Sequence, residues 1–103
     1  MIYKLQVPGP IADVEEIRIL EWHGAAGTLY AENDLVVELE TYKAVIEVRA
    51  GQAAYLRAVL CEAGDWRRIG ETLALLSDSV DEPLPTTTNA DDLSALTVAF
   101  AIV

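Results

Sequence analysis

The sequence presents one primary amine at a position that other proteins could reach. Only two lysines occur, Lys4 and Lys43, and Lys43 stands in the polar step 41–44, between strand-like apolar runs at 36–41 and 44–48. A connection this short between two strands is typical of a hairpin turn. An amine at a hairpin tip projects into water, where it is a poor nucleophile by itself but an accessible attachment point for a modifying enzyme. The pattern alone also allows Lys43 to be a plain solubilising turn residue.

The remaining reactive side chains predict neither a catalytic centre nor a metal site. His23 has no Ser, Cys or paired acid near it in the sequence, so we expect a surface or strand-end histidine. Cys61 lies in an apolar run and is expected to be a small buried hydrophobe. Glu38, Glu40 and Glu47 are of the type that serves as acid–base partners or metal ligands, but their partial alternation with apolar residues favours a solvated hairpin face. The single cysteine and single histidine exclude a disulfide framework and a Cys/His zinc cluster.

Composition narrows the class of protein further. The chain has 103 residues, a formal net charge of −10 and 52% hydrophobic residues, which fits one folded domain with room for a tail. The excess of acids argues against nucleic acid and anionic membrane surfaces as partners. We find no targeting segment and no apolar run of the ~20 residues that a membrane-spanning helix needs. The expected location is therefore the cytoplasm.

The two halves of the chain repeat weakly, and the repeat indicates β-structure. Gly27 and Gly64 are 37 positions apart, and the same shift aligns further turn and apolar residues: Ile19 with Leu56, Trp22 with Val59, Asn33 with Gly70, Asp34 with Glu71, Val36 with Leu73 and Leu39 with Leu76. Runs such as 17–22 and 55–60 are short and rich in β-branched or aromatic residues, as expected for strands. Trp22 and Trp66 are expected to pack in the core and under a turn. A helical pattern competes weakly at 12–21 and 90–99, but the regular turns favour an all-β sandwich or flattened barrel.

Composition also divides the chain into three parts. Residues 1–77 carry the repeat and are expected to form the domain. Residues 78–92 hold no aromatic and no basic residue but two of the four prolines, which is typical of a linker. Residues 93–103 are strongly apolar again, so we expect this segment to dock on the domain or on a partner, or to continue into a longer protein.

In its motifs and in the spacing between its turns, the sequence resembles the biotinyl/lipoyl attachment domain family over most of residues 5–76. The resemblance is carried by Glu-Leu-Glu-Thr-Tyr-Lys-Ala at 38–44 and by Glu47-Val48, with turns in register on either side at Gly27, Gly64-Asp65 and Gly70, and with Leu73 in the closing strand. No gap is needed from Gly27 to Lys43 or from Lys43 to Gly64.

The resemblance implies a flattened β-barrel of two small antiparallel sheets related by a pseudo-twofold axis. It implies that Lys43 is the covalent attachment site, presented by Glu40, Thr41, Tyr42 and Ala44. It also implies structural turns at Gly27, Asn33, Gly64, Asp65 and Gly70. A domain of this kind catalyses nothing itself: it carries acyl groups and electrons between enzymes of a 2-oxoacid dehydrogenase-like system. Its partners would be a lipoate or biotin ligase and the dehydrogenase and acyltransferase components of the complex.

The residues around Lys43 resemble lipoyl more than biotinyl domains. Ala44 follows the lysine and no Met flanks it, so we expect lipoate at Lys43, with biotin as the alternative. The sequence departs from the family pattern at Tyr42, where Asp is usual, and at Thr28, Asn33 and Ala54. Tyr42 removes a charge and adds a ring beside the lysine. The ring is expected either to fill the hairpin by stacking on its neighbours or to change the choice of partner. Two alternatives stay open: a biotin carrier of a carboxylase, and an unmodified interaction module that docks through the hairpin and the apolar tail, with Tyr42 as an anchor.

Overall fold

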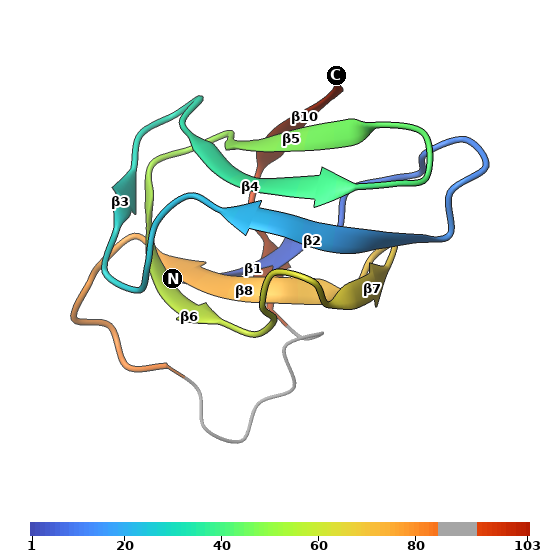
Figure 1. Ribbon diagram of the computed structural model, residues 1–103. Helices are drawn as coiled ribbons and strands as arrows, with labels where there is room; N and C mark the ends of the chain where they lie inside the picture. The colour runs from blue at the N-terminus through green and yellow to red at the C-terminus, as the bar shows by residue number, and fades with distance from the viewer. Residues whose placement is uncertain (85–92) are drawn as a thin grey trace.

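The computed structural model describes residues 1–84 and 93–103, and within these ranges the chain forms ten β-strands and no helix. The strands are β1 (Ile2–Gln6), β2 (Glu16–Trp22), β3 (Leu29–Tyr30), β4 (Leu35–Glu40), β5 (Val45–Ala50), β6 (Ala54–Val59), β7 (Trp66–Arg68), β8 (Thr72–Ser77), β9 (Ser94–Ala95) and β10 (Val98–Ile102). They form two five-stranded sheets, in the orders β3-β6-β8-β1-β9 and β10-β5-β4-β2-β7 (Figure 1). The predicted all-β fold is confirmed, and the strand at 16–22 excludes the helical alternative there.

Strand alternation builds the core between the sheets. In β5, Ile46, Val48 and Ala50 are buried, whereas Glu47 and Arg49 lie on the outer face. The same period of two directs aliphatic side chains inward in β2 and β6, whereas β4 and β8 also bury neighbouring residues. The largest fully buried ones are Leu5, Ile17, Ile19, Leu39, Ile46, Leu56, Leu73 and Leu76. Burying each such side chain stabilises the fold by about 1.5–3 kcal/mol.

The repeat seen in the sequence is a repeat of structure. Four strands of the second sheet, in the order β5-β4-β2-β7, correspond to β1-β8-β6-β3 of the first. Each half also supplies a glycine turn that bonds to the other half. The Gly27 N–H donates to the Leu56 carbonyl and the Gly64 N–H donates to the Ile19 carbonyl, both at 2.7 Å. These reciprocal bonds are what a pseudo-twofold axis between the halves requires.

The second turn of each half needs a left-handed backbone. Asn33 has a φ of 77° and its equivalent Gly70 has a φ of 90°. Asparagine is among the few residues with a side chain that visit this region readily, so the replacement of glycine by Asn33 keeps the turn. Acidic side chains close both turns: Asp34 accepts from the Ala31 N–H at 2.8 Å, and Glu71 accepts from the Arg68 N–H at 2.7 Å.

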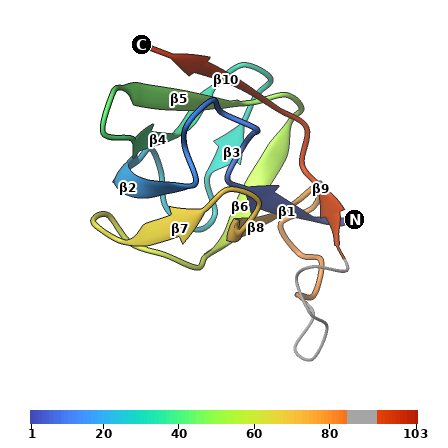
Figure 2. The ribbon, with the colours of Figure 1, turned by 90° about the vertical axis from the view of Figure 1, so that its right-hand side faces the viewer.

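The C-terminal segment adds one strand to each sheet. β9 pairs parallel with β1, and β10 pairs antiparallel with β5. Between them Leu96 is buried, and the Thr97 carbonyl accepts from the Gly51 N–H at 2.7 Å. The segment thus runs from one sheet across to the other (Figure 2). Of the expected linker at 78–92, residues 78–84 form no strand or helix and residues 85–92 lie outside the described residues.

No helix in the described part of the chain is long and apolar enough to cross a membrane.

Candidate functional site

The β4–β5 hairpin carries Lys43 at its tip. Strands β4 and β5 pair antiparallel with Glu40 opposite Val45, so residues 41–44 form the turn that the short polar step predicts. The hairpin lies at the same end of the molecule as the loop between β1 and β2 and as strand β7 (Figure 1). Three segments far apart in the sequence therefore meet near the lysine.

Thr41 holds the turn in shape. Its side chain is almost buried, and its Oγ1 accepts hydrogen bonds from the Lys43 N–H at 3.1 Å and from the Ala44 N–H at 3.0 Å. The Thr41 N–H in turn donates to the Ala44 carbonyl at 2.8 Å. A threonine hydroxyl bonded to the backbone in this way replaces water as the partner of the turn. The backbone of Lys43 is thereby fixed while its side chain stays outside.

The side chain of Lys43 projects from this turn and has two near neighbours. It is 54% exposed, and its Nζ lies 3.6 Å from Oδ2 of Asp13 and 5.2 Å from the centre of the Tyr42 ring. Tyr42 is itself 76% exposed, so the ring is displayed beside the lysine and does not fill the hairpin. Sequence reasoning missed Asp13, which lies in the β1–β2 loop with a φ of 63°. No local pattern links it to Lys43, since only the folded loop brings the two together.

A small, mainly apolar cavity lies beside the lysine turn. The cavity, of about 80 Å³, is lined mainly by aliphatic residues, including Ala44, Ile46 and, from the C-terminal strand, Ile102, and Lys43 is also part of the lining. Next to Ile102, the Val103 N–H donates to the Val45 carbonyl at 2.8 Å. Strand β10 thus packs directly beside the lysine turn.

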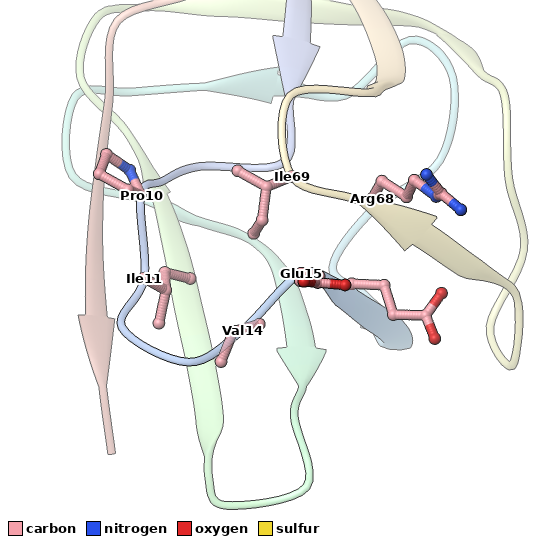
Figure 3. Close-up of a pocket in the computed structure, with 7 residues that line it drawn as sticks. Pro10, Ile11, Val14, Glu15, Arg68 and Ile69 are labelled. Carbon is pink, nitrogen blue, oxygen red and sulfur yellow. The ribbon is translucent and has the colours of Figure 1, made fainter.

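Two open hollows flank the β1–β2 loop. The first, of about 570 Å³, is lined by Pro10, Ile11, Val14, Glu15, Glu16, Arg68 and Ile69. Figure 3 shows Pro10 and Ile11 at one end of it and Arg68 at the other. The second, of about 720 Å³, lies on the side of the hairpin and is lined by Asp13, Val14, Glu15, Glu16, Tyr42 and Trp66.

The two tryptophans differ in burial. Trp22 packs against the core, and its indole N–H donates to the Cys61 carbonyl at 3.0 Å, as expected of a core residue. The expectation that Trp66 packs under a turn is wrong: Trp66 begins β7 and is 54% exposed, because its position in that strand faces outward at the edge of the sheet.

The fold joins His23 to two glutamates. The His23 Nε2 lies 2.6 Å from Oε1 of Glu38 and 3.7 Å from Oε2 of Glu21. The expectation that His23 lacks a paired acid is wrong, because Glu38 reaches it from the neighbouring strand and Glu21 from two residues earlier in the chain. His23 does follow the end of β2, as expected. Across residues 1–84 and 93–103, these three form the cluster whose ligand atoms are close enough to hold a metal ion. The short contact already gives His23 and Glu38 a hydrogen bond.

Cys61 behaves as a buried hydrophobe. Its side chain is buried, and burial raises the pKa of its thiol. A thiol that stays protonated is a weak nucleophile, so Cys61 offers no reactive centre.

Most of the chain is similar to known protein domains. Residues 3–76 match the model of a protein family described as "Biotin-requiring enzyme", which unites biotin and lipoyl domains. The chain is 29% identical over 86 residues to the dihydrolipoyllysine-residue succinyltransferase component of the 2-oxoglutarate dehydrogenase complex of Bacillus subtilis. It is 29% identical over 75 residues to the component of the same name from Staphylococcus saprophyticus. It is 28% identical over 81 residues to the dihydrolipoyllysine-residue acetyltransferase component 5 of the chloroplastic pyruvate dehydrogenase complex of Arabidopsis thaliana.

These relatives are much longer proteins. The matches cover 81%, 73% and 79% of this chain but only 21%, 18% and 17% of the relatives, respectively. The similarity therefore concerns only a part of each relative.

Proposed function

Because the chain belongs to the family of biotin and lipoyl attachment domains, we propose that it is a lipoyl-type carrier domain, acylated by lipoate on Nζ of Lys43. Domains of this family carry lipoate or biotin covalently and are not catalytic themselves, although their relatives are parts of enzyme complexes. The observation that carries the proposal is the exposed Lys43 at the tip of a turn whose backbone Thr41 holds in place.

The geometry suits formation of an amide. The Lys43 ammonium loses one proton to give the amine, whose nitrogen lone pair attacks the carboxyl carbon of lipoate, activated by a ligase as an acyl-adenylate. The bond from that carbon to the phosphate oxygen breaks, AMP leaves with the bonding pair, and the nitrogen gives up a second proton. The hydrogen bonds of Thr41 fix the backbone from which the amine projects, while Glu40, Tyr42 and the small Ala44 form the surface that a ligase meets.

The role of the domain is to move the attached group. Lipoate supplies a dithiolane that accepts acyl groups and electrons, and the chain supplies a tether and a recognisable surface. Tethering raises the effective concentration of the carried group at each active site to roughly the millimolar range. We propose that the partners are a lipoate ligase and the dehydrogenase and acyltransferase components of a 2-oxoacid dehydrogenase-like complex. The names of the relatives support this assignment.

The test is the intact mass of the protein after incubation with a lipoate ligase, ATP and lipoate, and in parallel with a biotin ligase and biotin. We expect a lipoyl increment in the wild type and in the matched control Lys4→Arg, and none in Lys43→Arg. Lys43→Arg should unfold at an unchanged temperature, because the substitution keeps the charge at an exposed turn.

Other results would overturn the assignment. A biotinyl increment in place of a lipoyl one would identify a biotin carrier. The absence of any increment, with a reference lipoyl domain modified in the same tube, would favour an unmodified interaction module.

A further inference from the structure

The hollow beside the hairpin combines two exposed aromatic rings with a set of carboxylates. We call it the aromatic–acidic hollow: Asp13, Val14, Glu15, Glu16, Tyr42 and Trp66, enclosing about 720 Å³. Tyr42 lies in the β4–β5 turn and Trp66 lies in β7, and both side chains are more than half exposed. Large aromatic side chains at a surface are the residues that most often anchor protein partners.

A cation of the chain itself lies at the edge of this hollow. The Lys43 ammonium approaches Asp13 at 3.6 Å and stands 5.2 Å from the centre of the Tyr42 ring. Both the carboxylate and the ring face are thus shielded by an internal positive charge. Lys43 and Asp13 are both more than half exposed, and such a surface pair contributes little stability, so it is easily exchanged for another.

Acylation of Lys43 would remove this internal cation. An amide nitrogen carries no charge, so it gives Asp13 no ion pair and the Tyr42 ring no cation–π contact. The net charge of −10 becomes more negative by one unit, and the change falls at the hollow. Asp13 and Tyr42 then lack the positive charge that they face in the unmodified protein.

We propose that the aromatic–acidic hollow is a docking site for an arginine side chain of a partner protein, and that acylation of Lys43 opens it. This inference rests on the proposed function. It means that a partner protein can distinguish the acylated carrier from the unmodified one. A guanidinium matches the site because it stacks on aromatic faces and binds carboxylates through two parallel hydrogen bonds. Tyr42, the departure from the family's Asp beside the lysine, supplies one of the rings.

The proposal can be tested without any ligase. Lys43→Gln replaces the ammonium by a neutral amide. Its affinity for a tetra-arginine peptide with acetylated and amidated ends is measured by NMR, from the shift of the Trp66 indole N–H at low salt. The indole signal is assigned by its loss in Trp66→Leu. We expect Lys43→Gln to bind the peptide about threefold more tightly than the wild type, which is the size of effect that one exposed ion pair gives.

Matched variants separate the hollow from the overall charge. Lys4→Gln makes the same change in net charge on β1, and we expect it to leave the affinity near that of the wild type. Lys43→Arg keeps a cation at the tip, and since a guanidinium suits the hollow at least as well as an ammonium, this variant should bind the peptide no more tightly than the wild type. In the Lys43→Gln background, Asp13→Asn should lower the affinity again while keeping the positive φ that asparagine tolerates.

The outcomes decide the proposal. An equal gain in Lys4→Gln, or no gain in Lys43→Gln, would overturn the gating by Lys43. Equal affinity for a tetra-lysine peptide with the same blocked ends would overturn the choice of arginine. The lipoylated protein should match Lys43→Gln. Failure of lipoate attachment is seen separately in the mass measurement, so loss of the proposed function and loss of arginine docking remain distinguishable.

Discussion

The hairpin that carries Lys43 and the end of β8 occupy equivalent places in the two halves of the molecule. In one half β4 pairs with β5, with Glu40 opposite Val45, and residues 41–44 join the two strands. In the other half β8 pairs with β1, with Ser77 opposite Ile2, but these strands are distant in sequence and nothing joins them there. Instead the Met1 amine lies 3.2 Å from Asp78 and 2.6 Å from Glu82.

The difference shows what the fold does and does not supply. The pseudo-twofold axis produces the same pair of strand ends twice, and the equivalent strands β4 and β8 bury nearly the same pattern of residues. Only one pair is closed by a turn, and only that turn holds a lysine; the position equivalent to Lys43 is Val80. Presentation of an amine therefore depends on the local sequence of the turn, added to a scaffold that both halves share.

The largest effect is expected from moving the lysine between the two places. We predict that the double variant Lys43→Arg/Val80→Lys is not lipoylated at all under conditions that modify the wild type completely. Val80 is exposed, so accessibility is not lacking, but residues 78–84 form no closed turn between paired strands. Intact mass is the measurement. A lipoyl increment on the double variant would mean that an exposed lysine at this symmetric position suffices.

Equal and large losses of stability are expected when equivalent core side chains of the two halves are truncated. Leu39 and Leu76 are equivalent and fully buried. Leu39→Ala and Leu76→Ala should each lower the free energy of unfolding by about 2–5 kcal/mol, with values within about 1 kcal/mol of each other. Urea titration followed by tryptophan fluorescence gives both numbers. A clear inequality would show that the halves differ in packing as well as in their turns.

Smaller and unequal losses of stability are expected from substitutions just after β4 and just after β8. Thr41 and Asp78 are equivalent positions. Thr41→Val keeps the shape but leaves the Lys43 and Ala44 N–H groups without their acceptor, so it should cost about 1–2 kcal/mol of unfolding free energy. Asp78→Asn, which alters only an exposed ion pair, should leave the unfolding midpoint unchanged. Equal effects of the two substitutions would contradict the role given to Thr41.

The smallest effect is expected at alkaline pH and involves one half only. Burial raises the pKa of Tyr30 above its ordinary value of 10.0, whereas the equivalent position holds the partly exposed Arg67. A raised pKa in the folded state contributes stability that is full below pH 10 and is lost as the pH rises through the folded pKa. One group limits the slope to about 1.4 kcal/mol per pH unit.

Tyr30→Phe is the variant that isolates this titration. It should flatten the slope of unfolding free energy between pH 9 and 11, while costing about 1 kcal/mol at neutral pH through the lost hydrogen bond to the His23 carbonyl. An unchanged slope would place the alkaline sensitivity elsewhere in the chain.

The strands and the lysine turn followed from local patterns. Alternation in 45–50 and the apolar run at 17–22 predict strands because a period of two needs only neighbouring residues to be read. The turn at 41–44 follows from its length alone. The side-chain pairs could not be read in this way, since Asp13 with Lys43 and Glu38 with His23 depend on loop conformation and on register between strands.

The sequence by itself determined the β-period, the 37-residue repeat and an amine in a short turn, because each depends on residues close together in the chain or on a fixed shift of it. Only the tertiary structure decided that Tyr42 and Trp66 share one hollow, that Asp13 faces Lys43, and that β10 lies beside the lysine turn. Such contacts arise where two sheets pack and their edges and loops converge. Their geometry is set by strand order and register over the whole fold, which no short stretch of sequence contains.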